Sequence, residues 1–329
     1  MSMRILFYGF RHTHLNSLYK KVADCEYTKI IACIEPDGEA RAKAEKTLGA
    51  TFSDESYENW LKRDFDVVAI GNAYGDRGEA IIKALQAGKH VIADKPICTD
   101  MEQLNKIRKL SREKNLKIAC MLDLRYVPQS VKAREIIMSG RLGEVRNVSF
   151  NGQHYIDYAN RPHWYFEDGL HGGTINDLAI HGVDLVRMIT ELEFDRTYAA
   201  RTWNAYAFKN EKFKDCATFM ARLENGAGVL ADVSYSAPSQ AFSMPSYWEF
   251  RFWCDRGMLQ LAYNDDRLTL FEDGEPETLR IECDKTSETY LTEFIAEIEN
   301  DSRDMTENIL RSTESALEIQ EAADRETEK

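Results

Sequence analysis

The sequence predicts an α/β protein with two domains: a doubly wound parallel sheet, then an α+β domain with an open, mostly antiparallel sheet. Three observations lead to this prediction. Short aliphatic runs alternate with helix-period segments over the first 122 residues, consecutive strand-like runs follow them, and 329 residues favour two domains over one. We therefore expect the domains to comprise residues 1–122 and 123–329.

The first domain is predicted to contain parallel strands joined by helices. The strands are residues 3–8, 29–34, 67–70, 90–93 and 116–121, and the helices are residues 14–22, 38–48, 78–87 and 101–115. Gly88 stands where a helix ends in a left-handed residue, and Thr99 with Glu102 has the spacing of a capping box. Because βα crossovers are right-handed, these strands should form a doubly wound sheet.

The second domain is predicted to combine consecutive strands with a few helices. The strands are residues 145–155, 197–206, 217–223, 229–235, 247–254, 258–262 and 268–271. The helices are residues 128–139, 173–190, 289–300 and 306–323, and we expect the last of them to pack back near the domain junction. Residues 324–329 are predicted to be a solvated tail.

Charge and composition exclude several classes of protein. The chain carries 42 Lys and Arg against 55 Asp and Glu, and its net charge of −13 repels nucleic acid and acidic membranes alike. We find no apolar stretch near the roughly 20 residues of a membrane span and no signal-peptide cleavage site. The seven cysteines are dispersed and lack a C-x-x-C pair, so we expect buried thiols in a cytoplasmic protein.

The turn after the first strand is a candidate binding site. A dinucleotide fingerprint would place glycines at 9, 11 and 14, but the turn Gly9-Phe10-Arg11-His12 has only the first of them. The N–H groups at the start of a helix attract an anion, and Arg11 adds positive charge. A plain βα turn is an equally open interpretation.

Glu35 is the candidate ligand of an adenosine ribose. It ends the second strand, 26 residues after Gly9, roughly where an acidic side chain accepts hydrogen bonds from the ribose. Because a carboxylate there repels the additional phosphate of NADP, the sequence favours NAD. The alternative is a turn with a solvated acid.

Lys95 and one helix carry the candidate chemistry. Lys95 follows the fourth strand, and open α/β sheets bind ligands beyond the carboxyl ends of their strands. Asp177, His181 and Asp184 are spaced to share one helical face. An imidazole can take a hydroxyl proton while hydride leaves the same carbon, and a carboxylate one turn away can orient it. A solvated lysine and a helix-stabilising Asp–His pair are the commoner meanings of these patterns.

These features together resemble the Gfo/Idh/MocA oxidoreductase family. The resemblance rests on Lys95 in D-K-P and on Asp177 and His181 in G-G-x-x-x-D-x-x-x-H-x-x-D, and it runs through nearly the whole chain. It implies an N-terminal Rossmann domain that binds NAD or NADP and a C-terminal domain whose open sheet often packs against another subunit. It also implies Lys95, Asp177 and His181 as catalytic residues and a cis peptide bond before Pro96.

The chain departs from the family pattern at three places. The glycine-rich turn is reduced to Gly9, Asp94 replaces the usual glutamate before the lysine, and Arg77 stands where a histidine is common. We assign cofactor binding to residues at the ends of the first four strands: Gly9, Phe10, Arg11, His12, Glu35, Gly71, Asn72, Tyr74, Asp94 and Lys95.

Histidine and aromatic residues of the second domain are candidates for a polyol pocket. Trp and Tyr faces pack against C–H groups, and imidazoles hydrogen-bond hydroxyls. The candidate substrate-binding residues are Arg125, His154, Tyr155, His163, Trp164, Asp177 and His181. A core role for Tyr155 and Trp164, and a hinge ion pair for Arg125, are the alternatives. The spacing of His154, His163, His171 and His181 fits no compact ligand motif, so we expect no metal.

The sequence thus predicts an NAD(P)-dependent oxidoreductase acting on a secondary alcohol or ketone of a sugar, inositol or related polyol. In this hypothesis His181 takes the hydroxyl proton, Asp177 orients His181, and Lys95 polarises the oxygen and relays protons. The alternatives are a non-catalytic nucleotide- or sugar-binding sensor and an NAD-dependent glycosidase. We expect no nucleic-acid or membrane partner, and the resemblance implies a homodimer or homotetramer formed through the C-terminal sheet.

Overall fold

The chain forms two compact units, each built around its own sheet. The computed structural model describes residues 2–327. The first unit consists of the chain up to Met121 together with Pro162–Gly172 and Thr289–Thr313. The second unit consists of Leu122–Arg161, Gly173–Glu288 and the chain from Glu314 onward. The units are therefore interleaved along the sequence.

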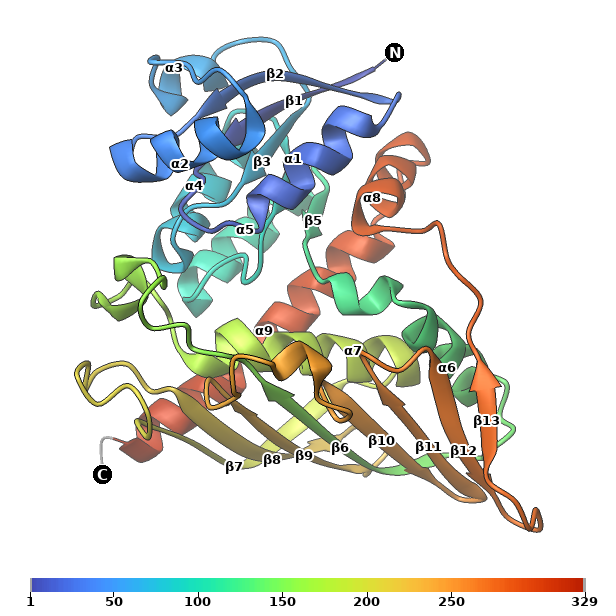
Figure 1. The fold of residues 1–329 in the computed structure, drawn as a ribbon. Helices are drawn as coiled ribbons and strands as arrows, with labels where there is room; N and C mark the ends of the chain where they lie inside the picture. The colour runs from blue at the N-terminus through green and yellow to red at the C-terminus, as the bar shows by residue number, and fades with distance from the viewer. Residues whose placement is uncertain (1, 328–329) are drawn as a thin grey trace. The chain divides into compact units, whose positions relative to one another are not determined.

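The sheet of the first unit is parallel and doubly wound (Figure 1), which confirms the predicted fold class. Its strand order is β2-β1-β3-β4-β5. The strands are β1 (Met3–Tyr8), β2 (Thr28–Ile34), β3 (Val67–Ile70), β4 (His90–Ala93) and β5 (Ile118–Cys120). The order changes direction between β1 and β3, and open α/β sheets bind ligands at such a switch point.

Helices join these strands. They are α1 (Leu15–Asp24), α2 (Gly38–Leu48), α3 (Tyr57–Leu61), α4 (Tyr74–Gln86) and α5 (Met101–Glu113), and the unit also contains η2 (His163–Phe166) and α8 (Tyr290–Glu299). Gly88 follows α4 with a φ of 75°, as predicted. The predicted capping box of Thr99 and Glu102 is wrong, because Asp100 is the N-cap of α5 and accepts a hydrogen bond from the Gln103 N–H at 2.8 Å.

The second unit contains an eight-stranded sheet in the order β13-β12-β11-β10-β6-β9-β8-β7. Only the β6–β9 pair is parallel, so the predicted mostly antiparallel sheet is confirmed. The strands are β6 (Val145–Gln153), β7 (Phe194–Trp203), β8 (Cys216–Leu223), β9 (Gly228–Ser234), β10 (Glu249–Cys254), β11 (Gly257–Ala262), β12 (Arg267–Glu272) and β13 (Leu279–Glu282).

Helices lie along one face of this sheet (Figure 1). The helical segments of the unit are η1 (Asp123–Tyr126), α6 (Pro128–Met138), the π-helical η3 (Ile175–Ala179), α7 (Ile180–Thr190), η4 (Ala241–Ser243) and the later part of α9 (Asp304–Thr327). Residues 324–326 are exposed, as predicted for a solvated tail, but they are helical, because α9 continues to Thr327 and Gln320 donates a hydrogen bond to Asp324 at 2.8 Å. Residues 328–329 lie outside the described residues.

Two further predictions concern the whole chain. None of the helices within residues 2–327 is long and apolar enough to span a membrane. All seven cysteines are free thiols; four are buried and three are partly exposed.

Candidate active site

A cavity of about 350 Å³ lies at the edge of the first sheet, where β1, β2 and β3 end. Tyr8 ends β1, Glu35 follows β2 and Asn72 follows β3, and all three line the cavity. The charged side chains of the lining are Arg11, Glu35, Asp37, Asp76, Glu79 and Lys83. The cavity therefore occupies the switch point of the doubly wound sheet and has more acidic than basic groups.

The turn at Gly9 is shaped by a close approach of two backbone segments. Gly9 has a φ of 79°, and a Cβ atom added there would lie 2.5 Å from the Asn72 side-chain oxygen. The His12 N–H donates to the Gly71 carbonyl oxygen at 3.1 Å, which ties the turn to the end of β3. Only glycine fits at residue 9, so the glycine that the fingerprint retains has a steric reason.

Glu35 is buried against this turn. One carboxylate oxygen accepts a hydrogen bond from the Phe10 N–H, and the other accepts one from the Asp37 N–H at 2.7 Å. Burial raises the pKa of Glu35, although these two backbone hydrogen bonds oppose that rise. The alternative of a solvated acid in a turn does not describe Glu35, because its side chain is enclosed.

Lys95 is buried at the carboxyl end of β4, on the same edge of the sheet. The Lys95–Pro96 peptide bond is cis, as the family resemblance implies. The Lys95 Nζ lies 3.5 Å from the Tyr74 hydroxyl oxygen. Below it, the Arg77 guanidinium donates hydrogen bonds to the carbonyl oxygens of Lys95 and Pro96 at 2.6 and 2.8 Å, so the main chain at the lysine is fixed.

Asp94 directly follows β4 and has no exposed surface. Its carboxylate is hydrogen-bonded to His12 Nδ1, lies 3.3 Å from His14 Nδ1, and accepts the Lys95 N–H at 2.8 Å. Burial alone would raise the pKa of Asp94, but His12, His14 and Arg77 together hold it well below its usual value. Burial lowers the pKa of His12 to about 3. The arrangement is therefore a carboxylate beside a neutral imidazole near neutral pH.

The segment Pro162–Gly172 belongs to the first unit and separates the predicted polyol-binding residues into two groups. Trp164 is 1% exposed and donates a hydrogen bond to the Arg11 carbonyl oxygen at 3.2 Å, which favours the alternative of a core role. His163 is exposed on the same segment. His154 and Tyr155 lie in the second unit. The four histidines of the rejected metal set are likewise divided between the units.

Asp177 and His181 lie in the second unit, on consecutive helical segments. Asp177 is buried in the π-helical η3, and His181 is in the first turn of α7. The Asp177 N–H donates to the Gly173 carbonyl oxygen at 3.0 Å, which helps to fix Asp177 within the segment. Single π-helical turns within helices are rare and frequently occur at functional sites.

Trp248 contacts two of the candidate histidines. Its ring centroid lies 5.4 Å from that of His181 and 6.2 Å from that of His154. Its φ of 50° is unusual for a non-glycine residue, and a Cβ atom at Gly152 would lie 2.5 Å from its indole. Trp248 falls within the predicted strand over residues 247–254, so the sequence does not single it out. The strand β10 begins only at Glu249, so Trp248 precedes it.

Arg125 is held by an ion pair within the second unit. Its guanidinium forms hydrogen bonds of 2.6 and 2.8 Å to the two carboxylate oxygens of Asp184, and both side chains are nearly buried. This geometry favours the ion-pair alternative for Arg125. Arg125 is therefore a structural partner of Asp184, which lies on the same helix as His181.

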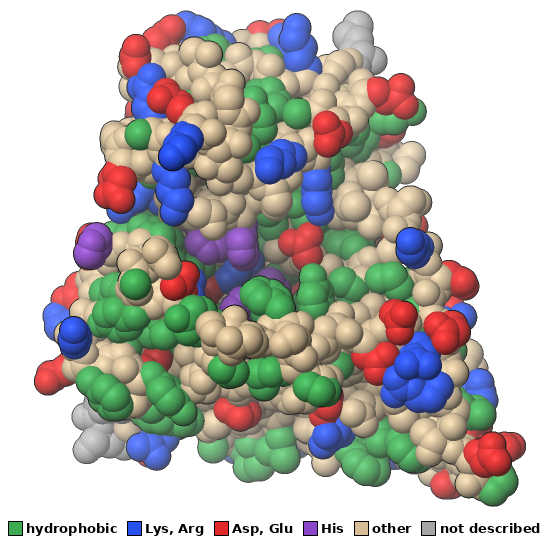
Figure 2. All heavy atoms as spheres, in the orientation of Figure 1, with side chains coloured by type: hydrophobic (Ala, Val, Ile, Leu, Met, Phe, Trp, Pro, Cys, Tyr) green, Lys and Arg blue, Asp and Glu red, His purple; other side chains and the backbone are tan. Residues whose placement is uncertain are grey.

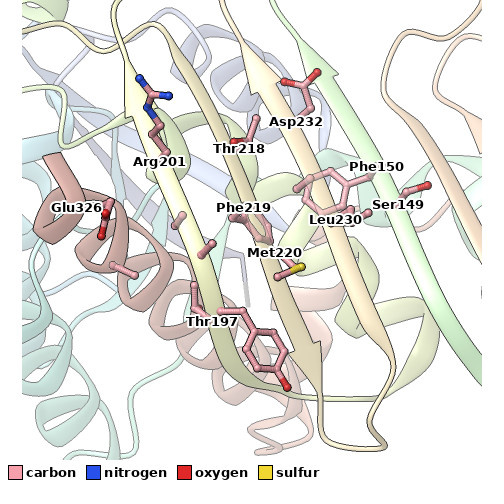
Figure 3. A pocket seen from close by; sticks show the side chains of 15 residues that line it. Ser149, Phe150, Thr197, Arg201, Thr218, Phe219, Met220, Leu230, Asp232 and Glu326 are labelled. Atoms are coloured by element: carbon pink, nitrogen blue, oxygen red, sulfur yellow. The ribbon is translucent and has the colours of Figure 1, made fainter.

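A second cavity, of about 750 Å³, lies against the sheet of the second unit. In Figure 3 the side chains of Arg201, Thr218 and Asp232 come from the adjacent strands β7, β8 and β9. The exposed apolar side chains on these strands are Tyr198, Met220 and Leu230. On the face shown in Figure 2, acidic and basic side chains are interspersed, so the excess negative charge forms no single patch there.

Family models match both parts of the chain. Residues 4–121 match the description "Oxidoreductase family, NAD-binding Rossmann fold", and residues 130–260 match "GFO/IDH/MocA C-terminal domain". These matches confirm the resemblance seen in the sequence and the predicted NAD-binding Rossmann fold.

Individual proteins are similar at low identity. Levoglucosan dehydrogenase of Pseudarthrobacter phenanthrenivorans is 28% identical over 182 residues, which cover 53% of this chain and 45% of that protein. The chain thus spans less than half the length of this relative. A levoglucosan dehydrogenase in complex with NADH and levoglucosan has a TM-score of 0.79 at 18% identity, over 99% of this chain and 98% of that one. Aldose-aldose oxidoreductase from Caulobacter crescentus, complexed with glycerol, has a TM-score of 0.82 at 16% identity. The match covers 99% of this chain and 98% of that one.

The edge of the first sheet fits a dinucleotide. The cavity lies beyond the carboxyl ends of the strands, and Gly9 lets the β1–α1 turn approach Asn72 closely. Glu35 and Asp37 line the cavity where a ribose with two hydroxyls needs hydrogen-bond acceptors. Of the predicted cofactor residues, Arg11, Glu35 and Asn72 line the cavity. Gly9, Phe10, His12 and Gly71 contact one another or these residues at the turn, and Asp94 and Lys95 follow β4 on the same edge.

Proposed function

Because this chain belongs to the Gfo/Idh/MocA oxidoreductase family, we propose that it transfers hydride between NAD and a secondary alcohol or ketone of a sugar, inositol or related polyol. NAD, when bound, supplies the hydride acceptor. The observation that best supports the proposal is the place of Lys95, a buried amine on the same sheet edge as the cavity beside Glu35. A lysine at this edge is suited to polarise a substrate oxygen.

We assign three catalytic roles. His181 takes the hydroxyl proton, and Asp177, which precedes it by one helical turn, orients the imidazole. Lys95 polarises the substrate oxygen and relays protons. Since Asp177 and Lys95 are both nearly buried, their charges act in a medium of low dielectric constant and are more effective than in water.

We propose that the sugar ring contacts the aromatic residues near His181. His154 and Trp248 lie on that side of the second unit, and Tyr155 follows His154 with a partly exposed ring. An indole face packs against ring C–H groups, while an imidazole hydrogen-bonds hydroxyls. This composition favours a polyhydroxylated ligand over an apolar one.

We further propose a cytoplasmic homodimer or homotetramer. Met220, Leu230 and Tyr198 are exposed apolar residues of the second sheet, and all three line its cavity. Figure 3 shows Met220 and Leu230 on adjacent strands. Apolar surface of this kind is typical of contacts between protein copies. We also propose that the domain boundary lies at residue 122 and that the N-terminal domain holds NAD.

The activity is tested with purified protein, NAD and a panel of sugars and inositols, by following NADH absorbance. We expect turnover on a polyol in the panel, and His181→Ala to lower kcat by about 10²- to 10⁴-fold while the affinity for NAD is retained. His90→Asn is the control, because His90 begins β4 at the opposite edge of the sheet from Lys95.

Three outcomes would contradict the proposal. NAD binding without oxidation or reduction of any sugar would indicate a sensor. Hydrolysis of aryl glycosides with no net NADH would indicate a glycosidase that uses transient oxidation. Full activity of His181→Ala on the true substrate would remove the assigned base.

A further inference from the structure

A continuous set of polar side chains leads from Lys95 to the surface of the first unit. Lys95 Nζ lies 3.5 Å from the Tyr74 hydroxyl oxygen, which lies 2.8 Å from that of Tyr165. The Tyr165 oxygen lies 3.1 Å from His12 Nε2. Each step is within hydrogen-bond range, and all four side chains are buried.

The set continues from His12 to solvent. His12 Nδ1 is hydrogen-bonded to one oxygen of Asp94, and His14 Nδ1 lies 3.3 Å from the other. The side chain of His14 is 47% exposed. We call these six side chains the polar row: Lys95, Tyr74, Tyr165, His12, Asp94 and His14.

The protonation states give the polar row a direction. Asp94 is ionised, so it only accepts hydrogen bonds, and His12 must carry its proton on Nδ1. The His12 ring is neutral near neutral pH, which leaves Nε2 as an acceptor for a tyrosine hydroxyl. The charged or titratable groups around the ring are Asp94, His14, Lys95, Tyr74 and Tyr165. Every donor from the Lys95 ammonium onward can therefore point toward Asp94.

A cation site is the competing explanation for the end of the polar row. The ligand atoms of His12, His14 and Asp94 all lie within 4.8 Å of one another. However, the Arg77 guanidinium lies 3.4 Å from the same Asp94 oxygen that binds His12, and Arg77 is fully buried. A fixed cation at that distance opposes a divalent ion, whereas it stabilises an ionised Asp94. The geometry therefore favours proton transfer over metal binding.

We propose that the polar row carries protons between Lys95 and bulk water. This inference rests on the proposed function, because oxidation of an alcohol releases one proton for each hydride transferred. The O–H and C–H bonds of the substrate break, a C=O bond forms, and the C–H electron pair leaves with the hydride. The hydroxyl proton that His181 takes must finally reach water, and Lys95 is the residue assigned to relay protons. In the reduction direction a proton must enter by the same route.

The transfer moves one proton per bond along the polar row. The Lys95 ammonium gives a proton to Tyr74 as Tyr74 gives its own to Tyr165, and Tyr165 protonates His12 Nε2. His12 releases its Nδ1 proton to one oxygen of Asp94. Rotation of the protonated carboxyl group presents the proton to His14, which passes it to water. Rotation of the hydroxyl groups and the return of the His12 tautomer restore the starting state, with no net change in any residue. None of the five residues beyond Lys95 is assigned a contact with the substrate; they position Lys95 and conduct its proton.

The first experiment uses the full chain and the variant His12→Gln, because glutamine keeps hydrogen-bonding groups but does not exchange protons readily. We expect kcat for polyol oxidation to fall by about 10²-fold with little change in KM, and the solvent isotope effect on kcat to rise. His14→Ala should lower kcat by a smaller factor, and added imidazole should restore it, because His14 is the exposed end.

His171→Gln is the matched control. His171 is also buried, and its ring centroid lies 5.7 Å from that of Tyr74 and 5.2 Å from that of Tyr165, but it is outside the polar row. This variant should leave the solvent isotope effect and the response to imidazole as in the original chain. The proposal is overturned if His12→Gln retains its kcat, or if its lower kcat comes with an unchanged isotope effect.

A second experiment needs no turnover, so it separates failure of the polar row from failure of the proposed function. In protein labelled with ¹⁵N at histidine, NMR should show that His12 is neutral near neutral pH, with its proton on Nδ1. The substitution Tyr165→Phe should shift the resonance of His12 Nε2. A proton on Nε2, or no shift in Tyr165→Phe, overturns the polar row. So does one equivalent of bound zinc that is lost in His14→Ala.

Discussion

Arg77 is a buried charged residue that connects two loops of the first unit. Its guanidinium is completely buried, and it donates hydrogen bonds to the carbonyl oxygens of Asn72, Lys95 and Pro96. It therefore joins the loop after β3 to the loop after β4. A histidine, which is common at this place in the resembling family, has two ring nitrogens and could not satisfy three carbonyl oxygens and Asp94 at once.

We expect Arg77→Met to lower the free energy of unfolding by about 3 kcal/mol or more, because it leaves buried carbonyl oxygens and Asp94 without their donor. Urea unfolding measures the change. Lys83→Met is the control on the same helix, since its ion pair with Glu58 is exposed and should contribute less than about 1 kcal/mol. Similar losses for the two variants would contradict this account of Arg77.

At the scale of elements, the junction of β2 with α2 combines two tasks. Asp37 is the N-cap of α2, where its side chain accepts the Ala40 N–H at 2.8 Å, and it also lines the cavity beside Glu35. Arg11 lies 3.6 Å from the Asp37 carboxylate. One residue therefore caps the helix and also contributes to the negative charge of the cavity.

We expect the chain to bind NAD more tightly than NADP, because the cavity carries four carboxylates against two cations. Asp37→Asn should narrow the ratio of the two dissociation constants by about three- to tenfold, since asparagine keeps the N-cap and removes a charge. Fluorescence titration with each cofactor measures the ratio. Asp54→Asn, which removes an exposed carboxylate outside the cavity lining, should leave it unchanged.

The sequence predicts those elements whose side-chain period is carried by several consecutive residues. Strands β1 and β3 and helix α2 have the predicted bounds, because buried aliphatic runs and N-cap signals mark them. The five-residue α3 and the four-residue β13 were not predicted. Helix α3 is too short to show a helical period, and β13 lacks the uninterrupted aliphatic run that marks the equally short β3. A local capping pattern can also give the wrong N-cap. The pattern indicated Thr99, but Asp100, one residue later, caps α5.

Candidate site residues can be predicted where a local motif marks them, but not where they depend on distant contacts. Strand and turn positions mark Glu35 and Gly9, and the structure brings the turn at Gly9 against Glu35 through the Phe10 N–H. Tyr165 and Trp248 have no local signal, since their partners His12 and His181 are far away in sequence. Long-range packing of aromatic side chains is decided by the tertiary fold, which a single sequence does not reveal.

For the whole molecule, buried neutral histidines make stability depend on pH. Burial lowers the pKa of His90 to about 4, and His90 Nδ1 accepts the Lys117 N–H at 2.9 Å, a bond that protonation would break. Unfolding exposes the ring and restores a pKa of about 6.5. Below about pH 6.5 the unfolded chain binds a proton that the folded chain does not, so the free energy of unfolding falls as the pH falls. Above about pH 6.5 the contribution of His90 is constant.

We expect the free energy of unfolding to fall between about pH 6.5 and pH 5, with His90 contributing up to about 1.4 kcal/mol per pH unit. His90→Asn should reduce this slope, because the asparagine oxygen can accept the same N–H without titrating. Urea unfolding at a series of pH values tests it. An equal slope in His90→Asn would show that other groups cause the loss, and His163→Asn, at an exposed histidine, should not alter it.

The interleaved path of the chain restricts how this molecule can be divided. The backbone passes from one unit to the other at residues 121, 161, 172, 288 and 313. A gene fragment ending at residue 121 would encode every strand of the parallel sheet, but it would omit Tyr165, Trp164 and α8. Exchange of one unit between relatives would require several simultaneous crossovers. The units are therefore expected to be expressed, folded and inherited as a single piece.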